Sequence, residues 1–238
     1  MKLEEQMNDL RLQGMMKRWE SLKEAKQLQG LSLKDGIELL LQAEWESRYN
    51  RKRERLTKQA NFRYQASLSE ISYVPDRNLD KTIIALLSDG SYVSKGEFIL
   101  ITGATGCGKS FLATALGQQA CSQGYKTMYV SMKKLSTQLK MSRVEGTYMK
   151  YIEKISKHNL LILDDFGLTA MDQQQSIDLM EIIEDRHGKN ATIVVSQLPV
   201  STWYDIIPDN TIADAILDRI IHTATRIELK GESLRKKK

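Results

Sequence analysis

The sequence is poor in the residues that cross-link a chain or bind a metal. Its 238 residues include two cysteines and three histidines, too few for a disulfide framework or a zinc site of the usual spacing. It also lacks any run of about 18 apolar residues, so we expect no transmembrane helix. The first ten residues mix both charges and have no apolar core like that of a signal peptide. These absences predict a cytoplasmic protein without a membrane partner.

Proline is also scarce, with three in the chain and none before Pro75. In the N-terminal region, apolar residues recur at three- to five-residue steps from Leu3 to Leu22, close to one helical face. A second helix is expected from Leu33 to Leu41, with Ser32 as its N-cap, and a third from about Ala43 to Phe62. This region therefore reads as helical.

The composition then shifts around Pro75, which predicts a turn or linker. We expect a small all-helical N-terminal domain over residues 1–70, which contacts a partner or DNA, and a larger domain over residues 71–238. A length of 238 residues fits one large domain accompanied by a small one.

The charges are unevenly distributed along the chain. The net charge is only +5, but residues 48–63 contain seven basic side chains against one acid, and residues 133–157 contain seven against two. Two separated basic stretches suggest an extended polyanion such as nucleic acid; a solvated helix face is the alternative. The candidate DNA contacts in the first stretch are Arg48, Arg51, Lys52, Arg53 and Arg55.

After Gly96, short apolar runs alternate with helical segments. These runs are Phe98–Thr102, Thr127–Ser131, Leu160–Leu163, Thr192–Val195 and, more weakly, Arg226–Leu229. Strands that alternate with helices predict an α/β fold, here a parallel five-stranded sheet flanked by helices.

One glycine-rich segment matches the phosphate-binding pattern G-x-x-x-x-G-K-[ST] in full. Its residues, with the one that follows, are Gly103, Ala104, Thr105, Gly106, Cys107, Gly108, Lys109, Ser110 and Phe111. The match follows an apolar strand and opens a helix, as the motif requires. Backbone N–H groups and the helix N-terminus favour a phosphate there. Lys109 is expected to reach the β- and γ-phosphates and the Ser110 hydroxyl to bind Mg²⁺, which predicts ATP and Mg²⁺ as ligands.

Carboxylates follow the third apolar run. Asp164 and Asp165 come directly after Leu163, at the end of a strand where parallel α/β folds bind their ligands. Asp164 is placed to hold Mg²⁺, directly or through water, and Asp165 to polarise an attacking water. The fourth run ends in Ser196 and Gln197, either of which is a candidate partner of the γ-phosphate or its water, Gln197 first. The alternative for both is simple strand termination before Pro199.

Together these motifs resemble the AAA+ ATPases, and more narrowly the DnaC and IstB-like branch. Three stretches resemble IstB-like transposition helper ATPases of bacterial insertion sequences: Leu163–Gly167, Ser196–Val200 and Arg226–Arg235. The basic helix over residues 46–58 is similar too. The resemblance covers nearly the whole chain. It implies an AAA+ P-loop sheet and a bacterial, cytoplasmic protein.

The resemblance also implies roles for single residues. Arg219 matches an arginine finger that completes a neighbour's site, which implies head-to-tail homo-oligomers; a structural ion pair is the alternative. Arg235 matches a second sensor arginine. A segment over residues 133–151 sits where this branch inserts a DNA-contacting helix, and a solvated surface is again the alternative. The candidate backbone-phosphate contacts there are Lys133, Lys134, Lys140, Arg143 and Lys150.

One departure from the family concerns the C-terminus. Only 19 residues follow Arg219, so the helical lid of an AAA+ module is expected to be minimal or missing. Nucleotide closure is then expected to depend on neighbouring copies.

The resulting hypothesis is an ATPase that oligomerises on duplex DNA and assists a cognate transposase. A DnaC-like loader of a replicative helicase is the main alternative, because it would share the ATPase chemistry. A small-molecule kinase would explain the phosphate loop but not the basic helix. A nucleotide-gated binding module without turnover is a further alternative. A GTPase is disfavoured, since no Asn-Lys-x-Asp motif occurs.

Overall fold

The computed structural model describes residues 2–222 and 224–234. Its contacts divide the chain into two compact units, Met1–Arg55 and Leu56–Lys238. The segment 56–70, which the sequence analysis placed in the N-terminal domain, thus belongs to the second unit. Each unit has its own packing, and the nucleotide motifs all lie in the second.

The first unit is helical, as expected, but its helices begin and end elsewhere. They are α1 (Leu3–Asp9), α2 (Gln13–Glu24) and α3, which starts at Leu33 and continues to Gln59 in the second unit. The expected helix from Leu3 to Leu22 is interrupted because Arg11 adopts a left-handed backbone with φ 56°. The two helices expected after Ser32 are one, since neither glycine nor proline separates Leu41 from Ala43. The Ser32 hydroxyl accepts a hydrogen bond from Asp35 N at 3.2 Å, which confirms it as the N-terminal cap.

A close contact between α2 and α3 organises the first unit. Gly14 lies against α3 so closely that a Cβ there would be 2.4 Å from the Ala43 carbonyl oxygen. The buried Glu44 carboxylate accepts hydrogen bonds from Gly14 N at 2.7 Å and Met15 N at 3.2 Å. It therefore caps the first turn of α2, where Leu12 offers no side-chain acceptor. Arg48 pairs with the other Glu44 oxygen at 2.6 Å.

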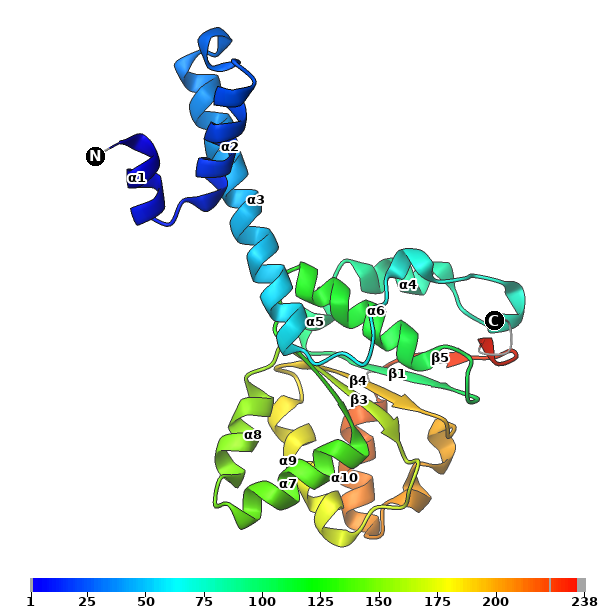
Figure 1. The fold of residues 1–238 in the computed structure, drawn as a ribbon. Coiled ribbons are helices and arrows are strands. Elements are labelled where there is room, and N and C mark those ends of the chain that lie inside the picture. Colours follow the sequence, from blue (N-terminus) through cyan, green and yellow to red (C-terminus); the bar gives the residue numbers. More distant parts are fainter. Residues whose placement is uncertain (1, 223, 235–238) are drawn as a thin grey trace. The chain divides into compact units, whose positions relative to one another are not determined.

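The second unit contains the expected five-stranded parallel sheet, with the order β2-β3-β4-β1-β5 (Figure 1). Its strands are β1 (Phe98–Gly103), β2 (Thr127–Ser131), β3 (Leu160–Phe166), β4 (Ala191–Ser196) and β5 (Thr225–Leu229). All five expected strands are confirmed. β3 runs further than expected, to Phe166, and so contains both Asp164 and Asp165.

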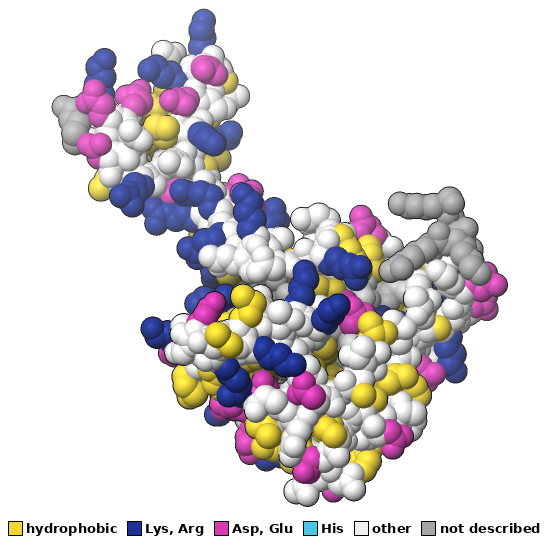
Figure 2. Space-filling model, turned by 60° about the horizontal axis from the view of Figure 1, so that its bottom comes forward, with side chains coloured by type: hydrophobic (Ala, Val, Ile, Leu, Met, Phe, Trp, Pro, Cys, Tyr) yellow, Lys and Arg dark blue, Asp and Glu magenta, His cyan; other side chains and the backbone are white. Residues whose placement is uncertain are grey.

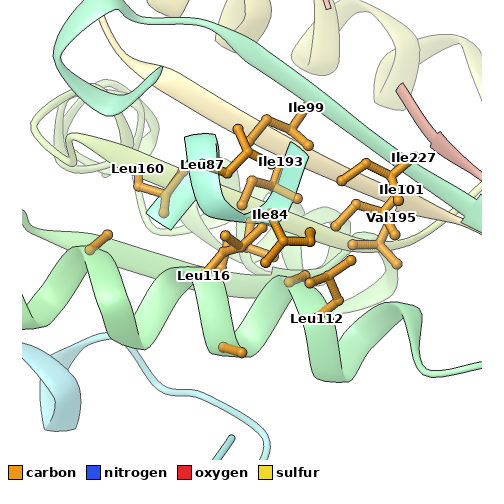
Figure 3. Close-up of a cluster of buried hydrophobic side chains, with 14 of the residues drawn as sticks. Ile84, Leu87, Ile99, Ile101, Leu112, Leu116, Leu160, Ile193, Val195 and Ile227 are labelled. Carbon is orange, nitrogen blue, oxygen red and sulfur yellow. The ribbon is translucent and has the colours of Figure 1, made fainter. Parts of the chain in front are cut away.

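Helices cover both faces of this sheet, as Figure 1 shows. On one face lie α4 (Lys81–Ser88), α5 (Ser91–Lys95) and α6 (Lys109–Ser122). On the other lie α7 (Met132–Val144), α8 (Tyr148–Ser156), α9 (Gln173–Arg186) and α10 (Asn210–Ile221). Successive side chains of β1 alternate between the two resulting cores: Ile99 and Ile101 face α4 and α6 (Figure 3), and Phe98 and Leu100 face the other layer.

Short 3₁₀ turns complete the chain: η1 (Leu28–Gly30), η2 (Leu68–Glu70), η3 (Pro75–Arg77), η4 (Val200–Thr202) and η5 (Tyr204–Ile206). The turn η3 confirms the turn that was expected at Pro75. After β5, the described residues 230–234 form no α-helix. In the part of the chain that the structure describes, no helix is both long and apolar enough to cross a membrane.

Candidate functional site

A pocket of about 390 Å³ opens at the carboxyl ends of the parallel strands. It is lined by the phosphate loop, by the ends of β3 and β4, and by two segments from opposite ends of the second unit. The lining residues are Arg63, Tyr64, Thr105, Gly106, Gly108, Lys109, Ser110, Phe111, Asp164, Asp165, Val195, Ser196, Gln197 and Leu234. Segments far apart in sequence therefore converge on the predicted phosphate site.

The backbone of the loop between β1 and α6 requires its glycines. Gly103, Gly106 and Gly108 have φ values of 139°, 85° and 94°, which residues with a Cβ rarely adopt. At Gly106, a Cβ would lie 2.2 Å from Ser233 Oγ. The loop thus has the left-handed backbone and close packing that are common where backbone N–H groups bind an anion.

Lys109 begins α6 and is buried against the loop. Its Nζ donates to the Ala104 carbonyl oxygen at 2.8 Å. This bond holds the ammonium group over the loop, next to the position that the motif assigns to the phosphates. The neighbouring Cys107 side chain is buried and packs in the core on the α6 side of the sheet.

Three donors fix the Asp164 carboxylate. Ser110 Oγ lies 3.2 Å from one oxygen, and Asp165 N donates to the same oxygen at 2.8 Å. The hydroxyl of Tyr129, on β2, donates to the other oxygen. The structure therefore brings Ser110 and Asp164 together as expected and adds Tyr129, which the sequence analysis missed. Its only signal was a phenolic hydroxyl in the middle of a mostly buried strand.

Asp165 has a different environment from Asp164. Its backbone is left-handed, with φ 59°, an uncommon and strained conformation for a residue other than glycine. Burial and the neighbouring Asp164 raise the pKa of its carboxyl group, although Arg63 and Lys109 oppose the rise. The side chain lines the pocket, where it is available to a water molecule.

Ser196 and Gln197 are neighbours at the end of β4, but their side chains have different partners. The buried Ser196 hydroxyl donates to the Phe166 carbonyl oxygen at 2.7 Å and accepts from Leu198 N at 3.1 Å. It thus ties the ends of β3 and β4 together. Gln197 instead faces the phosphate loop, where its Oε1 accepts from Thr105 Oγ1 at 2.7 Å. Of the two, Gln197 has the geometry expected of a partner for a γ-phosphate or its water.

Arg77 supports the phosphate loop from outside the pocket, a role that the sequence analysis missed. This buried arginine donates to the Cys107 carbonyl oxygen at 2.9 Å and to the Ser72 carbonyl oxygen at 2.9 Å. Its own carbonyl oxygen accepts from Lys230 N at 3.1 Å, and Leu234 N donates to Gly106 O at 3.0 Å. The segment after β5 is therefore bonded both to Arg77 and to the loop.

The two family arginines lie outside this pocket or outside the described chain. Arg219, on α10, donates to Glu184 Oε1 at 2.8 Å and to the Ala215 carbonyl oxygen at 2.7 Å, and it does not line the pocket of its own chain. This position is compatible with both alternatives: an arginine finger that completes a neighbour's site, and a structural ion pair. Arg235 lies outside the described residues.

The candidate DNA contacts differ in how far they are engaged by other side chains. Arg48 and Arg51 pair with Glu44, Lys140 pairs with Asp172, and Arg143 pairs with the buried Asp178. The remaining candidates are exposed, and the described residues provide them with no ion pair: Lys52, Arg53, Arg55, Lys133, Lys134 and Lys150. Figure 2 shows lysine and arginine side chains gathered along the second half of α3.

The oxygen atoms in the pocket fit Mg²⁺. Magnesium prefers hard oxygen ligands and often binds through one or two carboxylates together with substrate phosphates. Ser110 Oγ and Asp164 Oδ1, 3.2 Å apart, supply such a pair. Among the described residues, no group of three histidine, cysteine or acidic side chains is arranged to hold a metal.

Comparisons with known proteins agree with this geometry. The chain is 40% identical over 232 residues to a protein of Sinorhizobium fredii named as insertion sequence ATP-binding protein y4pL, covering 98% of this chain and 95% of the relative. It is 38% identical over 198 residues to the ATP-binding protein named for insertion sequence IS1162 of Pseudomonas fluorescens, covering 83% and 86%. The crystal structure of DnaI shares the fold, with a TM-score of 0.58 and 24% identity over 71% of this chain and 90% of that one.

A family model described as "IstB-like ATP binding protein" matches residues 5–238, nearly the whole chain. The chain therefore belongs to the IstB-like ATP-binding protein family.

Proposed function

We propose that the protein is a Mg²⁺-dependent ATPase that assembles on duplex DNA and assists the transposase of an insertion sequence. The observation that carries this proposal is the convergence of Lys109, Ser110, Asp164 and Asp165 on one pocket in a chain of the IstB-like family. The relatives are named for insertion sequences and for ATP binding. The bacterial cytoplasm is the corresponding location.

In this proposal, each pocket residue has one task. The loop N–H groups and Lys109 bind the β- and γ-phosphates, and Ser110 and Asp164 hold Mg²⁺, which would neutralise charge that develops on the phosphate oxygens. Asp165 orients and polarises the attacking water, and Gln197 contacts the γ-phosphate or that water. Arg219, which does not line the pocket of its own chain, reaches the site of a neighbouring copy.

DNA binding is assigned to the two basic stretches. Lys52, Arg53 and Arg55 on α3 and Lys133, Lys134 and Lys150 on the α7–α8 segment are exposed and suited to phosphate contacts without base readout. Such binding weakens steeply with salt because counterions are released. We assign partner contacts to α3 as well, because Leu33, Ile37, Leu41 and Trp45 are exposed at four-residue spacing along one side of it.

A loader of a replicative helicase remains the second candidate, because the DnaC helicase loader shares the fold. The family match favours transposition. The two candidates differ in the partner that stimulates hydrolysis: a transposase encoded beside the gene, or a hexameric helicase. Adding each purified partner to an ATPase assay separates them.

The test of the proposal is the mass in solution by light scattering, with ATP and Mg²⁺, with and without duplex DNA at low salt. We expect a large oligomer that needs both ATP and DNA, together with release of phosphate. A monomer under all of these conditions would contradict assembly on DNA and the trans role of Arg219. An absence of phosphate release from a DNA-bound oligomer would instead indicate a nucleotide-gated binding module.

A further inference from the structure

Arg63 is a second cation in the nucleotide pocket, and none of the motifs accounts for it. The residue lies four positions after the last residue of α3, Gln59, and lines the same pocket as Lys109, Asp165 and Gln197. It also lines an adjoining polar groove, which shares Asp165 with the pocket. Arg63 therefore sits at the boundary between these two spaces, on the side where Asp165 lies.

The backbone around Arg63 is anchored to the sheet and to α6. The Ala60 carbonyl oxygen accepts from Tyr129 N at 2.9 Å. The Phe62 ring contacts the Tyr129 ring edge to face at 6.3 Å between centroids, and the Tyr64 ring stacks on Phe111 at 6.2 Å. Contacts on both sides thus fix the place from which the Arg63 side chain extends.

The Arg63 guanidinium is exposed and has no internal partner. No described residue forms an ion pair or a hydrogen bond with it, in contrast to Arg77 and Arg186, whose guanidinium groups donate to backbone carbonyl oxygens. It lines the same pocket as Asp165, the water-polarising carboxylate of the proposed function. An unpaired cation in that position is available to an anion in the pocket.

The charges of the pocket favour such an anion. Lys109 and Arg63 are its cations, and Asp164 and Asp165 its carboxylates. A bound triphosphate brings several negative charges, of which Mg²⁺ neutralises only part. Because Arg63 and Asp165 both line this pocket and the adjoining groove, we place Arg63 at the end of the site where the γ-phosphate is attacked, rather than at the α-phosphate.

We propose that Arg63 contacts the γ-phosphate of ATP bound in its own chain and thereby distinguishes ATP from ADP. This inference rests on the proposed ATPase function and adds a residue to it. Arg63 supplies a planar pair of N–H donors that suits phosphate oxygens. The α3 helix with its basic stretch ends just before it, so the nucleotide-sensing arginine and the candidate DNA contacts occupy one continuous segment.

The experiment measures the affinities for ADP and for the slowly hydrolysed analogue ATPγS, with Mg²⁺ and without DNA, at a protein concentration where the chain is monomeric. The variants are Arg63→Ala, Arg63→Lys and, as a control with the same loss of charge, Arg226→Ala on β5. Arg226 is exposed and lies outside the pocket. Thermal melting checks that each variant is folded.

We expect Arg63→Ala to bind ATPγS about tenfold more weakly and ADP within about twofold of the wild type, as befits the loss of one charged hydrogen bond. The ATPγS affinity of Arg63→Lys should lie between that of the wild type and that of Arg63→Ala. Arg226→Ala should match the wild type for both nucleotides. Equal loss of ATPγS and ADP affinity would overturn the γ-phosphate contact, and so would unchanged affinity for both.

The binding readout keeps this inference separate from the proposed function. If the wild type prefers ATPγS to ADP and the preference is lost in Arg63→Ala, the assignment of Arg63 holds even where no phosphate is released. If the wild type hydrolyses ATP and Arg63→Ala keeps the same nucleotide preference and turnover, Arg63 is excluded while the ATPase function stands.

Discussion

Asp164 and Asp165 are adjacent in sequence but are held in different ways. Asp164 is buried and accepts hydrogen bonds from Ser110, Tyr129 and the Asp165 backbone. Asp165 has a left-handed backbone, lines the pocket and has a raised pKa. A carboxylate fixed by several donors suits metal binding, and one with fewer partners and a pocket beside it suits contact with water. The different environments of the two residues therefore separate their tasks.

The first prediction concerns turnover in Asp165→Asn. The amide keeps the shape of the side chain and tolerates the left-handed backbone, but it cannot take up a proton from water. We expect hydrolysis to fall at least about 100-fold, with ATP affinity within a few-fold of the wild type. Phosphate release and nucleotide titration measure the two quantities. Equal loss of both would place Asp165 in binding rather than in the chemical step.

The second prediction concerns the pH dependence of stability at the same residue. A raised pKa in the folded state means that folded Asp165 keeps its proton to a higher pH than unfolded Asp165. Its protonation therefore favours the folded state at low pH, and this contribution is lost as the pH rises through the folded pKa. Asp165→Asn lacks this loss, so its advantage in Tm over the wild type should be near zero below about pH 3.8 and should grow toward neutral pH.

Thermal melts from acidic to neutral pH measure this difference. We expect the variant to melt at a higher temperature than the wild type at pH 7. Asp185→Asn, which removes an exposed carboxylate from α9, is the control with the same change in charge. A variant that is less stable than the wild type at neutral pH would show that the Asp165 charge stabilises the fold.

At the scale of elements, the strands could be predicted because each is a short apolar run. The phosphate loop and the carboxylates then followed, since parallel strands bring their carboxyl ends together. The predicted helix bounds in the first unit were less accurate. Arg11, just after α1, has a left-handed backbone although it is not a glycine, and no residue near Leu41 indicates that α3 continues. Local pattern is a weak guide to such boundaries.

Tyr129, Arg77 and Arg63 were missed for a different reason. Their roles depend on contacts with residues distant in sequence: Tyr129 with Asp164, Arg77 with Cys107, and Arg63 with the pocket that Asp165 lines. These contacts cannot be predicted from the hydrophobic periodicity or from the spacing of motifs. Only the packed sheet and its flanking segments bring the residues together.

The third prediction concerns the contact between α2 and α3. In Gly14→Ala, the new Cβ would lie 2.4 Å from the Ala43 carbonyl oxygen and 2.7 Å from Glu44 Cα, both backbone atoms that cannot move alone. The helices must separate, which also weakens the cap that Glu44 provides to α2. We expect a loss of about 1–3 kcal/mol in the stability of the first unit, with nucleotide affinity unchanged.

Gly36→Ala is the matched control, because it lies on α3 and a Cβ there meets no atom within 4 Å. It should stabilise the helix by about 0.5–1 kcal/mol. Circular dichroism during thermal melting, with nucleotide titration alongside, measures both variants. A Gly14→Ala protein as stable as the wild type would show that the two helices do not depend on this close approach.

At the scale of the whole molecule, the position of Arg219 bears on how an active assembly is built. Its guanidinium group is bonded to Glu184 and Ala215 and does not line the pocket of its own chain. If it serves a neighbour's pocket, each complete site draws Asp165 from one copy and Arg219 from the next. That arrangement requires a head-to-tail interface, in which the two contacting surfaces differ.

The last prediction tests this arrangement by mixing two inactive variants. Arg219→Ala keeps Asp165, and Asp165→Asn keeps Arg219, so a contact between the two in the correct order restores one complete site. In an equal mixture that assembles at random on DNA, about one interface in four has this order, and hydrolysis should recover to about a quarter of the wild-type rate. Each variant alone should remain inactive under the same conditions. Phosphate release from mixtures of varied ratio measures the effect, with the maximum expected at equal amounts. If no mixture recovers activity although light scattering shows that the variants co-assemble, Arg219 acts within its own chain, and its bond to Glu184 is then structural.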